Sequence, residues 1–445
     1  MTNGTNGQLN VYIETYGCQM NVYDSEMIGG LLTKTGYQQT MDLSDADVIL
    51  VNTCAIRDHA EQRVIGRLGQ LNKYKLMNPD VVVGVLGCMS QRIGDRLLGK
   101  SSYLDLAVGT DQYDQLPQLI QNVRETHVAT AALEQDRTQN YVGILPKRNM
   151  NSVNAFVTIM RGCNNYCTFC IVPMTRGRER SRSIPDIIHE VEVCVANGFK
   201  EITLLGQNVN SYRSEKKERF PELLEAVAAV NGVKRIRFTS PHPKDATDRM
   251  FEVMGADNAV CESLHLPVQS GSTRILKAMR RRHTKEEFIE KAMRAYEMIP
   301  GLAMSTDIIV GFPGETDADF EDTLDVVRQV RFHSAYTFKY SPRENTPAYE
   351  MEDTVPETVK QERLEALIDL QRQITQERLQ EMVGKTYRIL VEKTSKKRES
   401  QLFGRTRNNQ PVVFDGDASL IGEFVPVKAT GVRGITLVGE RVSET

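Results

Sequence analysis

The sequence predicts an α/β protein in three parts: an N-terminal doubly wound parallel sheet, a central partial (β/α)6 barrel and a small C-terminal all-β barrel. Two stretches in which strand and helix patterns alternate indicate the first two parts, because such alternation is typical of parallel sheets. A final stretch of short, closely spaced strand patterns indicates the third part. A chain of 445 residues is long enough for roughly two to four domains.

The first alternating stretch spans residues 9–126. Its strand patterns NVYIETYGC, VILVNTC, VVVGVLGC and LDLAVGT are separated by helical patterns, among them a long polar helix over residues 58–77. In doubly wound sheets, ligands bind beyond the carboxyl ends of the strands. Cys18, Cys54 and Cys88 end successive strand patterns at intervals of 36 and 34 residues. We therefore expect these three thiols, the sheet-edge set, to meet at one edge of the sheet.

The remaining chain divides into three predicted segments. Residues 127–154 lack periodicity and are interpreted as a linker. Residues 155–383 contain six strand patterns, which predicts an incomplete barrel with its chemistry on the loops after the strands, and they end in a charged helix. Residues 384–445 contain short strands and predict a small barrel of a kind that binds nucleic acid, with a purely structural β module as the alternative.

The charge distribution and the cysteine count narrow the classes of function. A formal net charge of -3 argues against a globally basic nucleic-acid binder, but residues 384–445 carry 11 Lys and Arg against 7 Asp and Glu. This local excess is typical of contact with a polyanion. No apolar run reaches the roughly 20 residues of a membrane span, so we expect a cytoplasmic protein. In a reducing compartment, eight cysteines indicate metal ligands, nucleophiles or core residues rather than disulfides.

The most specific signal for chemistry lies in MRGCNNYCTFCIVPMTRGRERSRS, residues 160–183. Cys163, Cys167 and Cys170 have CxxxCxxC spacing and form the CxxxCxxC set. Structural zinc normally takes four protein ligands, and no nearby histidine supplies a fourth. Three thiolates suit a four-iron, four-sulfur cluster with one iron left open for a substrate or cofactor. A degenerate zinc knuckle is the alternative.

The sheet-edge set makes a similar case. If its thiols meet, they form a second pocket that is one ligand short of a closed site, and an open iron there would hold exchangeable sulfur or another exogenous ligand. The alternative is three buried cysteines that behave as small apolar residues. Cys194 and Cys261 join neither set and are interpreted as structural.

Six motifs together resemble those of the radical S-adenosylmethionine methylthiotransferases, specifically the MiaB type that acts on tRNA. They are YGCQMN, VNTCAIRDHAEQR, GVLGCMSQR, GCNNYCTFCIVPMTRGRERSR, LLGQNVNSY and GFPGET. The resemblance covers nearly the whole chain, and residues 384–445 are similar to a TRAM domain. It implies that the CxxxCxxC set holds the radical [4Fe-4S] cluster, whose open iron binds S-adenosylmethionine, and that the sheet-edge set holds an auxiliary [4Fe-4S] cluster.

The resemblance also implies which residues bind S-adenosylmethionine: Phe169, Gln207, Asn208, Ile309 and Gly311. Some positions depart from the family pattern. Gln207 and Asn208 are neutral where the family is usually acidic, and Asp307 replaces the first glycine of the adenine-binding GxIxGxxE strand. Glu315 comes one residue late, so we do not expect it to contact the cofactor. Met174 stands where relatives often carry an aromatic residue.

The implied reaction is methylthiolation of C2 of N6-isopentenyladenosine next to the anticodon of tRNA, using two molecules of S-adenosylmethionine and a cluster-borne sulfur. No side-chain acid or base removes such a hydrogen, so the cofactor supplies the reactivity and the protein supplies orientation. The expected partners are tRNA with an isopentenylated anticodon stem-loop and an external electron donor of unknown identity. We expect a monomer that does not contact a membrane.

Positive charge follows the CxxxCxxC set directly, at Arg176, Arg178, Arg180 and Arg182. Because guanidinium groups pair well with phosphates, we expect these arginines to contact the tRNA. Residues 280–282 and a run formed by Lys393, Lys396, Lys397 and Arg398 are further candidates. For these two later runs a solvated face is the alternative.

Three other functions remain open at this point. RimO-type relatives methylthiolate an aspartate of a ribosomal protein, and another relative type acts on threonylcarbamoyl-adenosine in tRNA. A different class of protein would use the clusters only structurally and bind RNA without catalysis. His242 and His265 follow strand patterns and are interpreted as structural histidines rather than ligands or acids.

Overall fold

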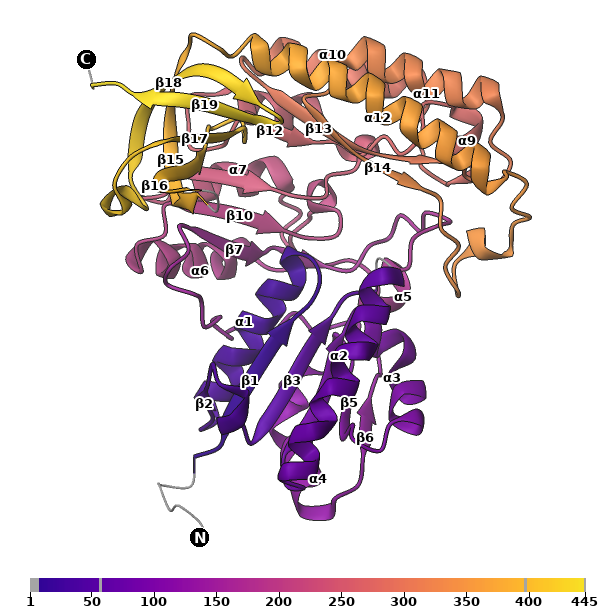
Figure 1. Cartoon of the computed structure of the whole chain (residues 1–445), viewed down its shortest axis with the longest axis vertical. Helices are drawn as coiled ribbons and strands as arrows, with labels where there is room; N and C mark the ends of the chain where they lie inside the picture. Colours follow the sequence, from indigo (N-terminus) through magenta and orange to yellow (C-terminus); the bar gives the residue numbers. More distant parts are fainter. Residues whose placement is uncertain (1–7, 56–57, 396–397, 444–445) are drawn as a thin grey trace. The chain divides into compact units, whose positions relative to one another are not determined.

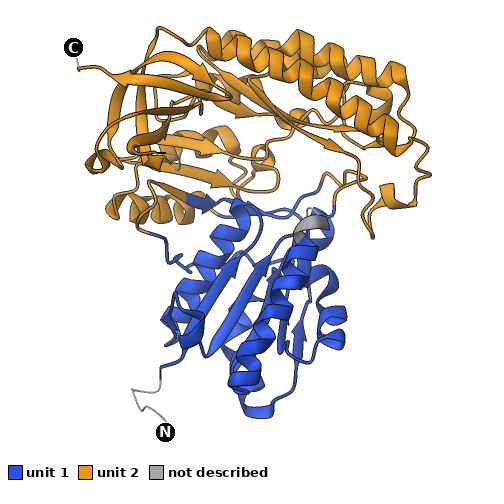
Figure 2. Ribbon diagram, viewed as in Figure 1, with its two compact units in different colours: residues 1–149, 156–164, 171–182 blue, residues 150–155, 165–170, 183–445 orange. Residues whose placement is uncertain are grey.

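The computed structural model describes residues 8–55, 58–395 and 398–443. The chain forms two compact units (Figure 2): unit 1 contains residues 1–149, 156–164 and 171–182, and unit 2 contains residues 150–155, 165–170 and 183–445. This partition divides the CxxxCxxC set, because Cys163 belongs to unit 1 while Cys167 and Cys170 belong to unit 2. The boundaries predicted at residues 126, 154 and 383 stay a prediction.

Unit 1 contains a six-stranded sheet with the order β2-β1-β3-β4-β5-β6 (Figure 1). All of its strand pairs are parallel. Its strands are β1 (Asn10–Thr15), β2 (Gln38–Gln39), β3 (Val48–Thr53), β4 (Val82–Gly87), β5 (Leu106–Val108) and β6 (Thr130–Ala132). Because β1 lies between β2 and β3, the chain winds outward in both directions, and the predicted doubly wound sheet is confirmed.

Helices cover both faces of this sheet. They are α1 (Gln19–Lys34), α2 (Asp58–Met77), α3 (Cys88–Lys100) and α4 (Leu116–Thr126). Every residue of β3 and β4 is buried, as expected for central strands of a parallel sheet. Apolar residues of α2 and α3 pack on one face, and α1 and α4 also contact the strands. Polar side chains can therefore gather only at the ends of the strands.

Apart from the last three residues of β7, unit 2 contains six strands in two sheets, β11-β10-β7 and β12-β13-β14, in which the β10–β11, β12–β13 and β13–β14 pairs are parallel. They are β7 (Asn154–Thr158), which begins in this unit, β10 (Glu201–Leu205), β11 (Arg235–Phe238), β12 (Ser263–His265), β13 (Ala303–Val310) and β14 (Ser334–Lys339). A parallel bridge between Ile236 and Val260 links the groups just before β12. Five of these strands fall within the predicted strand patterns and β7 begins one residue before its pattern, at Asn154, so the predicted partial barrel is confirmed.

The barrel helices begin at defined caps. They are α6 (Ile184–Ala196), α7 (Phe220–Ala228), α8 (Asp248–Gly255), α9 (Thr273–Ala278), α10 (Lys285–Met298), α11 (Asp317–Val330) and α12 (Glu357–Gln380). The helices α6, α8, α9, α10 and α11 follow a Ser or Thr whose hydroxyl accepts a backbone N–H of the first turn. Such caps satisfy an otherwise unpaired donor and set the start of each helix.

The last strands close into a five-stranded barrel with the order β15-β16-β17-β19-β18. They are β15 (Thr386–Ser395), β16 (Arg398–Arg405), β17 (Pro411–Asp415), β18 (Phe424–Arg433) and β19 (Thr436–Arg441). Leu379 and Met382, at and just beyond the end of α12, pack into the apolar core of this barrel. The predicted all-β barrel is confirmed. Lys396 and Lys397 lie outside the described residues.

Two arginines of β11 hold the small barrel against the partial barrel within unit 2. Arg235 is 1% exposed and donates to the carbonyl oxygens of Arg405 at 2.8 Å and Arg388 at 2.6 Å. Arg237 donates to the carbonyl oxygens of Arg407 and Thr406 at 2.8 and 2.9 Å. No helix within the described part of the chain is long and apolar enough to cross a bilayer.

We predict that Arg235→Met lowers the melting temperature of the protein. The change leaves two buried carbonyl groups without their donor, at a cost of about 1–3 kcal/mol each. Arg433→Met removes a charge from an exposed position of β18 in the small barrel and serves as the control. Thermal unfolding followed by circular dichroism measures both, and equal melting temperatures would contradict the role assigned to Arg235.

Candidate metal centres

The sheet-edge cysteines follow three neighbouring strands. Cys18 lies three residues past β1 and precedes α1, Cys54 directly follows β3, and Cys88 is the first residue of α3, directly after β4. The prediction that each cysteine ends its strand is therefore wrong in detail, because the strands stop one to three residues earlier. The strand ends are nonetheless in register, since Thr15 pairs with Asn52 and Thr53 with Gly87. The carboxyl edge of the sheet thus carries all three thiols.

Glycines allow these loops to approach one another. Gly17 has a φ of +140°, and a Cβ atom there would lie 2.5 Å from the Cβ of Cys54. Gly87 has a φ of +92°, and a Cβ atom would lie 2.5 Å from the carbonyl oxygen of Thr53. Only glycine adopts such a backbone without strain and leaves this space free. The residue before Cys18 and the residue before Cys88 therefore both pack on the end of β3.

Two buried asparagines fix the first turn of α1 against β3. The side chain of Asn21 donates to the Asn52 side chain at 3.2 Å and to the Thr53 carbonyl at 3.1 Å. Asn52 in turn donates to the Asn21 carbonyl at 2.9 Å and to Ser25 at 2.9 Å. Because both side chains are fully buried, their donors depend on these partners. This pair holds Cys18 close to Cys54.

In the sheet-edge set, the surroundings of Cys18 favour the thiolate form. A hydrogen bond from the Cys54 thiol lowers the pKa of Cys18 to about 6, and the positive charge of Arg176 acts in the same direction. Burial raises the pKa of Cys88, and Arg176 opposes this effect. Cys18 retains contact with solvent, whereas Cys54 and Cys88 are buried. A cationic group beside partly accessible thiols is an environment that suits metal binding.

The donor chemistry of this set fits an iron-sulfur cluster with an open position. The set offers three cysteines from one unit, which is one donor fewer than a closed structural zinc site requires. Within residues 8–55, 58–395 and 398–443, no group of three or more His, Cys, Asp or Glu side chains is arranged to hold a metal ion. The case for this centre therefore depends on the convergence of the strand ends and on the donor type.

The CxxxCxxC set follows β8 (Met160–Arg161), and its first cysteine is held by unit 1. The backbone N–H of Cys163 donates to the carbonyl of Gly177 at 3.1 Å. Gly162 has a φ of +77°, and a Cβ atom there would lie 2.1 Å from the carbonyl oxygen of Arg178. Cys163 is buried, so its thiol is held in a protected position.

The other two cysteines of the set are held by unit 2. Thr168, between them, donates through its N–H to Met279 at 3.1 Å and accepts from the N–H of Ala348 at 2.8 Å. The guanidinium of Arg281 donates to the Cys167 sulfur at 3.5 Å and to the carbonyl of Pro267 at 2.7 Å. Arg281 is 5% exposed. It therefore does not face RNA, contrary to the prediction for residues 280–282. Arg280 and Arg282 are exposed.

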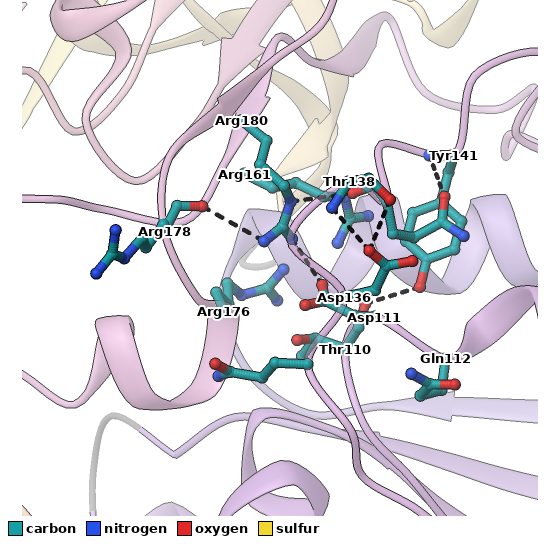
Figure 3. A network of polar contacts seen from close by, with 12 residues as sticks. Thr110, Asp111, Gln112, Asp136, Thr138, Tyr141, Arg161, Arg176, Arg178 and Arg180 are labelled. Carbon is teal, nitrogen blue, oxygen red and sulfur yellow. Dashed lines mark hydrogen bonds and ion pairs between the residues drawn. The ribbon is translucent and has the colours of Figure 1, made fainter.

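Three of the four arginines after the CxxxCxxC set are buried, contrary to the prediction that they face RNA. Arg176, Arg180 and Arg182 are 3%, 7% and 6% exposed. Arg176 closes the short helix α5 (Val172–Arg176), and Arg180 lies in β9 (Arg180–Ser181), which pairs with β8. Only Arg178 is exposed, and its side chain points away from the other labelled residues (Figure 3). We therefore withdraw Arg176, Arg180 and Arg182 as phosphate contacts.

Two buried carboxylates partner these arginines within unit 1. Asp24 of α1 accepts from Arg161 at 2.6 Å and from Arg176 at 2.8 Å. Asp111 accepts from Arg180 at 2.7 Å (Figure 3). Removing Arg180 would leave the buried Asp111 carboxylate uncompensated, which typically costs about 3–5 kcal/mol, whereas Asp24 keeps one cation if either of its two partners is removed. The arginines therefore hold the α5–β9 segment in place.

The segment predicted as a linker contributes to the same network. The ring of Tyr141 lies 4.7 Å from the Arg161 guanidinium and stacks on Tyr113. Its hydroxyl donates to the carbonyl of Thr110 at 2.9 Å. Residues 133–153 have neither helix nor strand, but this tyrosine is only 5% exposed. The predicted linker, residues 127–154, therefore contains the sheet strand β6, and the rest of it is irregular in backbone but still packed.

The structure brings together two of the residues predicted to bind S-adenosylmethionine. Phe169 and Ile309 pack on one apolar cluster of unit 2 that includes Phe312 and Met279. Gly311 follows β13, and its N–H donates to the Glu315 carboxylate at 2.8 Å. Glu315 also forms a buried ion pair with Arg363 at 2.8 Å, so it is occupied by the protein itself. This geometry fits the expectation that Glu315 does not contact S-adenosylmethionine.

Gln207 and Asn208 lie just beyond the end of β10. The Asn208 amide donates to Asp245 at 3.0 Å, while its oxygen is buried and has no hydrogen-bond partner in the described part of the chain. A buried acceptor of this kind fits the ammonium group of an amino-acid ligand. The five predicted cofactor contacts stay a prediction.

The two histidines noted in the sequence differ in their surroundings. His265 contacts Ser305 at 3.0 Å and Asp307 at 3.4 Å through its two ring nitrogens. Burial, followed by the charge of Arg281, lowers the pKa of His242 far below its usual value. His242 accepts from the N–H of Lys244 at 3.1 Å and lies 5.9 Å from the ring of His283. His242 is therefore a neutral, buried side chain.

Sequence reasoning missed the residues that position the two sets: Asn21, Asp24, Asn52, Arg161 and Arg281. Asn21 and Asp24 lie within two helical turns of Cys18, and Asn52 lies two residues before Cys54. Asn21 is part of the motif YGCQMN, and Asn52 is part of VNTCAIRDHAEQR. Polar residues on an otherwise apolar strand such as VILVNT were the available signal for Asn52. Their roles depend on partners from other segments, which no local pattern reveals.

Family models match three parts of the chain. Residues 10–109 match the model described as Uncharacterized protein family UPF0004. Residues 157–327 match the Radical SAM superfamily, and residues 380–442 match the TRAM domain. The first match contains the whole sheet-edge set, and the second contains the whole CxxxCxxC set.

Curated relatives match almost the entire chain. A protein of Thermoanaerobacter sp. (strain X514) is 48% identical over 97% of this chain and 92% of its own length. A protein of Carboxydothermus hydrogenoformans is 48% identical over 94% of this chain and 96% of its own length. A protein of Clostridium botulinum (strain Okra / Type B1) is 44% identical over 97% of this chain and 96% of its own length. Each is named tRNA-2-methylthio-N(6)-dimethylallyladenosine synthase.

Solved structures share the fold at low sequence identity. The radical S-adenosylmethionine methyltransferase TsrM from Kitasatospora setae is 12% identical and covers 77% of each chain with a TM-score of 0.58. The cobalamin-dependent radical enzyme OxsB is 12% identical, covers 82% of this chain and 56% of its own, and has a TM-score of 0.53. These matches support the architecture alone.

We predict that Gly87→Ala reduces the iron bound through the sheet-edge set. The added Cβ would collide with the end of β3, and the left-handed backbone costs about 1–3 kcal/mol for a non-glycine residue. Gly99→Ala, near the end of the following helix α3, has open space around it and is the control. Iron content after anaerobic reconstitution measures the effect. Equal iron in both variants would show that the close approach at residue 87 is not required.

Proposed function

The chain belongs to the MiaB-type tRNA methylthiotransferase family, a radical S-adenosylmethionine family, and we propose that it is a tRNA-2-methylthio-N6-dimethylallyladenosine synthase. Its substrate is then N6-isopentenyladenosine next to the anticodon, and its product carries a methylthio group at C2. Its cofactors are two [4Fe-4S] clusters and S-adenosylmethionine.

The observation that carries this proposal is the presence of two separate three-cysteine sets in one chain. One set lies in the loop after β8, and the other follows the carboxyl ends of a doubly wound sheet. Each set supplies three thiols, so a four-iron cluster bound there would have one iron without a protein ligand. A single cluster would suffice for radical generation. A second open set provides the place for the sulfur that this reaction transfers.

The side chains of the chain supply position rather than acid-base chemistry. When bound, the clusters and S-adenosylmethionine provide the radical and the sulfur that substitute an unactivated aromatic C–H bond. The Asn208 oxygen would accept a hydrogen bond from the ammonium of S-adenosylmethionine, and Phe169 and Ile309 would present an apolar surface to it. Arg281 fixes the Cys167 sulfur through its guanidinium.

The small barrel supplies charge for the RNA. Its exposed basic residues are Lys385, Arg388, Lys393, Arg398, Lys428, Arg433 and Arg441. Lys393 lies 5.2 Å from the ring of Phe403, and Arg388 lies 5.0 Å from the ring of Phe424. Basic residues beside aromatic rings suit both phosphates and unstacked bases. Arg178 adds an exposed guanidinium close behind the CxxxCxxC set.

The remaining features of this proposal concern the cellular setting. The protein acts in the cytoplasm as a monomer, and an external donor delivers the electrons for both clusters. An aspartate of a ribosomal protein and threonylcarbamoyl-adenosine are the alternative acceptors of the methylthio group, and the following measurement separates them.

We predict that cells lacking this gene lose 2-methylthio-N6-isopentenyladenosine from bulk tRNA and accumulate N6-isopentenyladenosine. Mass analysis of nucleosides checks this result. A plasmid with the wild-type gene restores the product, and one with Cys163→Ala does not, because the radical cluster is lost. Cys194→Ala, a buried cysteine of α6 outside both sets, is the matched control and should restore it. An unchanged nucleoside profile in the deletion strain would exclude this substrate and direct the search to the ribosomal protein.

We predict further that each cysteine set accounts for about half of the bound iron. Replacing Cys163, Cys167 and Cys170 together by alanine should remove one cluster, and replacing Cys18, Cys54 and Cys88 should remove the other. Iron analysis with Mössbauer or electron paramagnetic resonance spectra of the two triple variants measures this. Full iron content in either variant would show that its cysteines are not cluster ligands.

A further inference from the structure

A buried arginine lies beside the sheet-edge set. Arg176 donates through Nη2 to Asp24 at 2.8 Å, and its side chain lies against Cys88 and near Cys18. Its Nη1 atom is buried and has no hydrogen-bond partner among the described residues. The two N–H bonds of Nη1 therefore have no oxygen or nitrogen acceptor among the described residues, and the Cys88 sulfur lies beside this guanidinium.

The charges in this network leave an excess of one cation. Arg161 and Arg176 share the single carboxylate of Asp24, and Arg180 takes that of Asp111. Three guanidinium groups thus face two carboxylates, all of them at least nine-tenths buried. An uncompensated charge away from water is costly unless an anion lies near it. A cluster bound to the sulfur atoms of the sheet-edge set would be an anion in this position, because Arg176 lies against Cys88.

Contacts of α5 hold the Arg176 side chain beside the sheet-edge set. Arg176 closes α5, whose preceding residue Thr175 accepts through its carbonyl from Thr110 at 2.6 Å. Ile171, just before α5, packs in one apolar cluster with Ala55 and Cys88. Both ends of this short helix are therefore tied to the carboxyl edge of the sheet, where Cys54 and Cys88 lie.

We propose that Arg176 hydrogen-bonds through Nη1 to a sulfur of the auxiliary cluster and raises the reduction potential of that cluster. This inference rests on the proposed function, because it requires the sheet-edge set to hold a cluster. Reduction adds one electron, and hence one negative charge, to the cluster. A fixed positive charge and a hydrogen bond to sulfur both stabilise the reduced state more than the oxidised state.

The geometry also predicts that Arg176 can be replaced without loss of the fold. In Arg176→Gln, Asp24 keeps its bond to Arg161 at 2.6 Å, so no carboxylate is left unpaired. The excess cation of the network disappears at the same time. Arg178→Gln removes the same charge two residues later from an exposed position and is the matched control.

We predict that Arg176→Gln shifts the midpoint potential of the auxiliary cluster to a more negative value, while Arg178→Gln leaves it unchanged. The full-length protein with Cys163, Cys167 and Cys170 replaced by alanine provides the background, since it retains only the auxiliary cluster. A titration with dithionite, followed by electron paramagnetic resonance, measures the potential. Arg176→Lys keeps the charge without the planar fork and should give an intermediate potential.

The outcomes separate this inference from the proposed function. If Arg176→Gln has the same midpoint potential as the background protein, the inference is overturned. It is also overturned if Arg178→Gln shifts the potential as much as Arg176→Gln does, because such a shift would be a general effect of charge. If Arg176→Gln binds no cluster, Arg176→Lys decides: an intermediate potential supports the inference, and an unchanged potential overturns it. If the background protein, in which Cys163, Cys167 and Cys170 are alanine, binds no cluster, both this inference and the assignment of the sheet-edge ligands are overturned. The proposed substrate is tested separately, by the nucleoside profile.

Discussion

Thiolates that leave water need positive charge beside them, and this requirement organises both cysteine sets. Arg176 lies against Cys88 and near Cys18, and Arg281 donates to the sulfur of Cys167. Each guanidinium is buried and fixed by an oxygen partner, Asp24 in one case and the Pro267 carbonyl in the other. A cationic donor held in this way lowers the cost of collecting anionic ligands in a small volume.

Close backbone packing is the second condition for the sheet-edge set. Parallel strands end at a common edge, but three thiols meet there only if the loops after the strands come within van der Waals contact. Gly17 and Gly87 make this approach possible, and the amide pair of Asn21 and Asn52 fixes it by satisfying buried donors. Topology thus brings the cysteines to one edge, and small and polar neighbours set their separation.

The burial of three arginines changes the account of how RNA is bound. If Arg176, Arg180 and Arg182 all faced solvent, the cluster loop itself would carry most of the positive charge for tRNA. Since they are buried, the candidates for phosphate contacts are Arg178, Arg280 and Arg282, which are exposed, and the exposed cations of the small barrel. That barrel is fixed to the partial barrel within unit 2 by the backbone hydrogen bonds of Arg235 and Arg237. Its exposed cations therefore have a defined position relative to Cys167 and Cys170.

The sequence by itself determined the fold class, the two cysteine sets and the family, because strand periodicity, cysteine spacing and motif order are local properties of the chain. It could not determine which charges are buried. A run of four arginines suggests a solvated or phosphate-binding face, yet the carboxylates that bury two of them lie 152 and 69 residues away. Such ion pairs form only when distant segments pack together. Tertiary structure alone therefore decided that Arg176 lies beside the sheet-edge thiols rather than at the surface, since burial of a charge depends on partners that the local sequence does not contain.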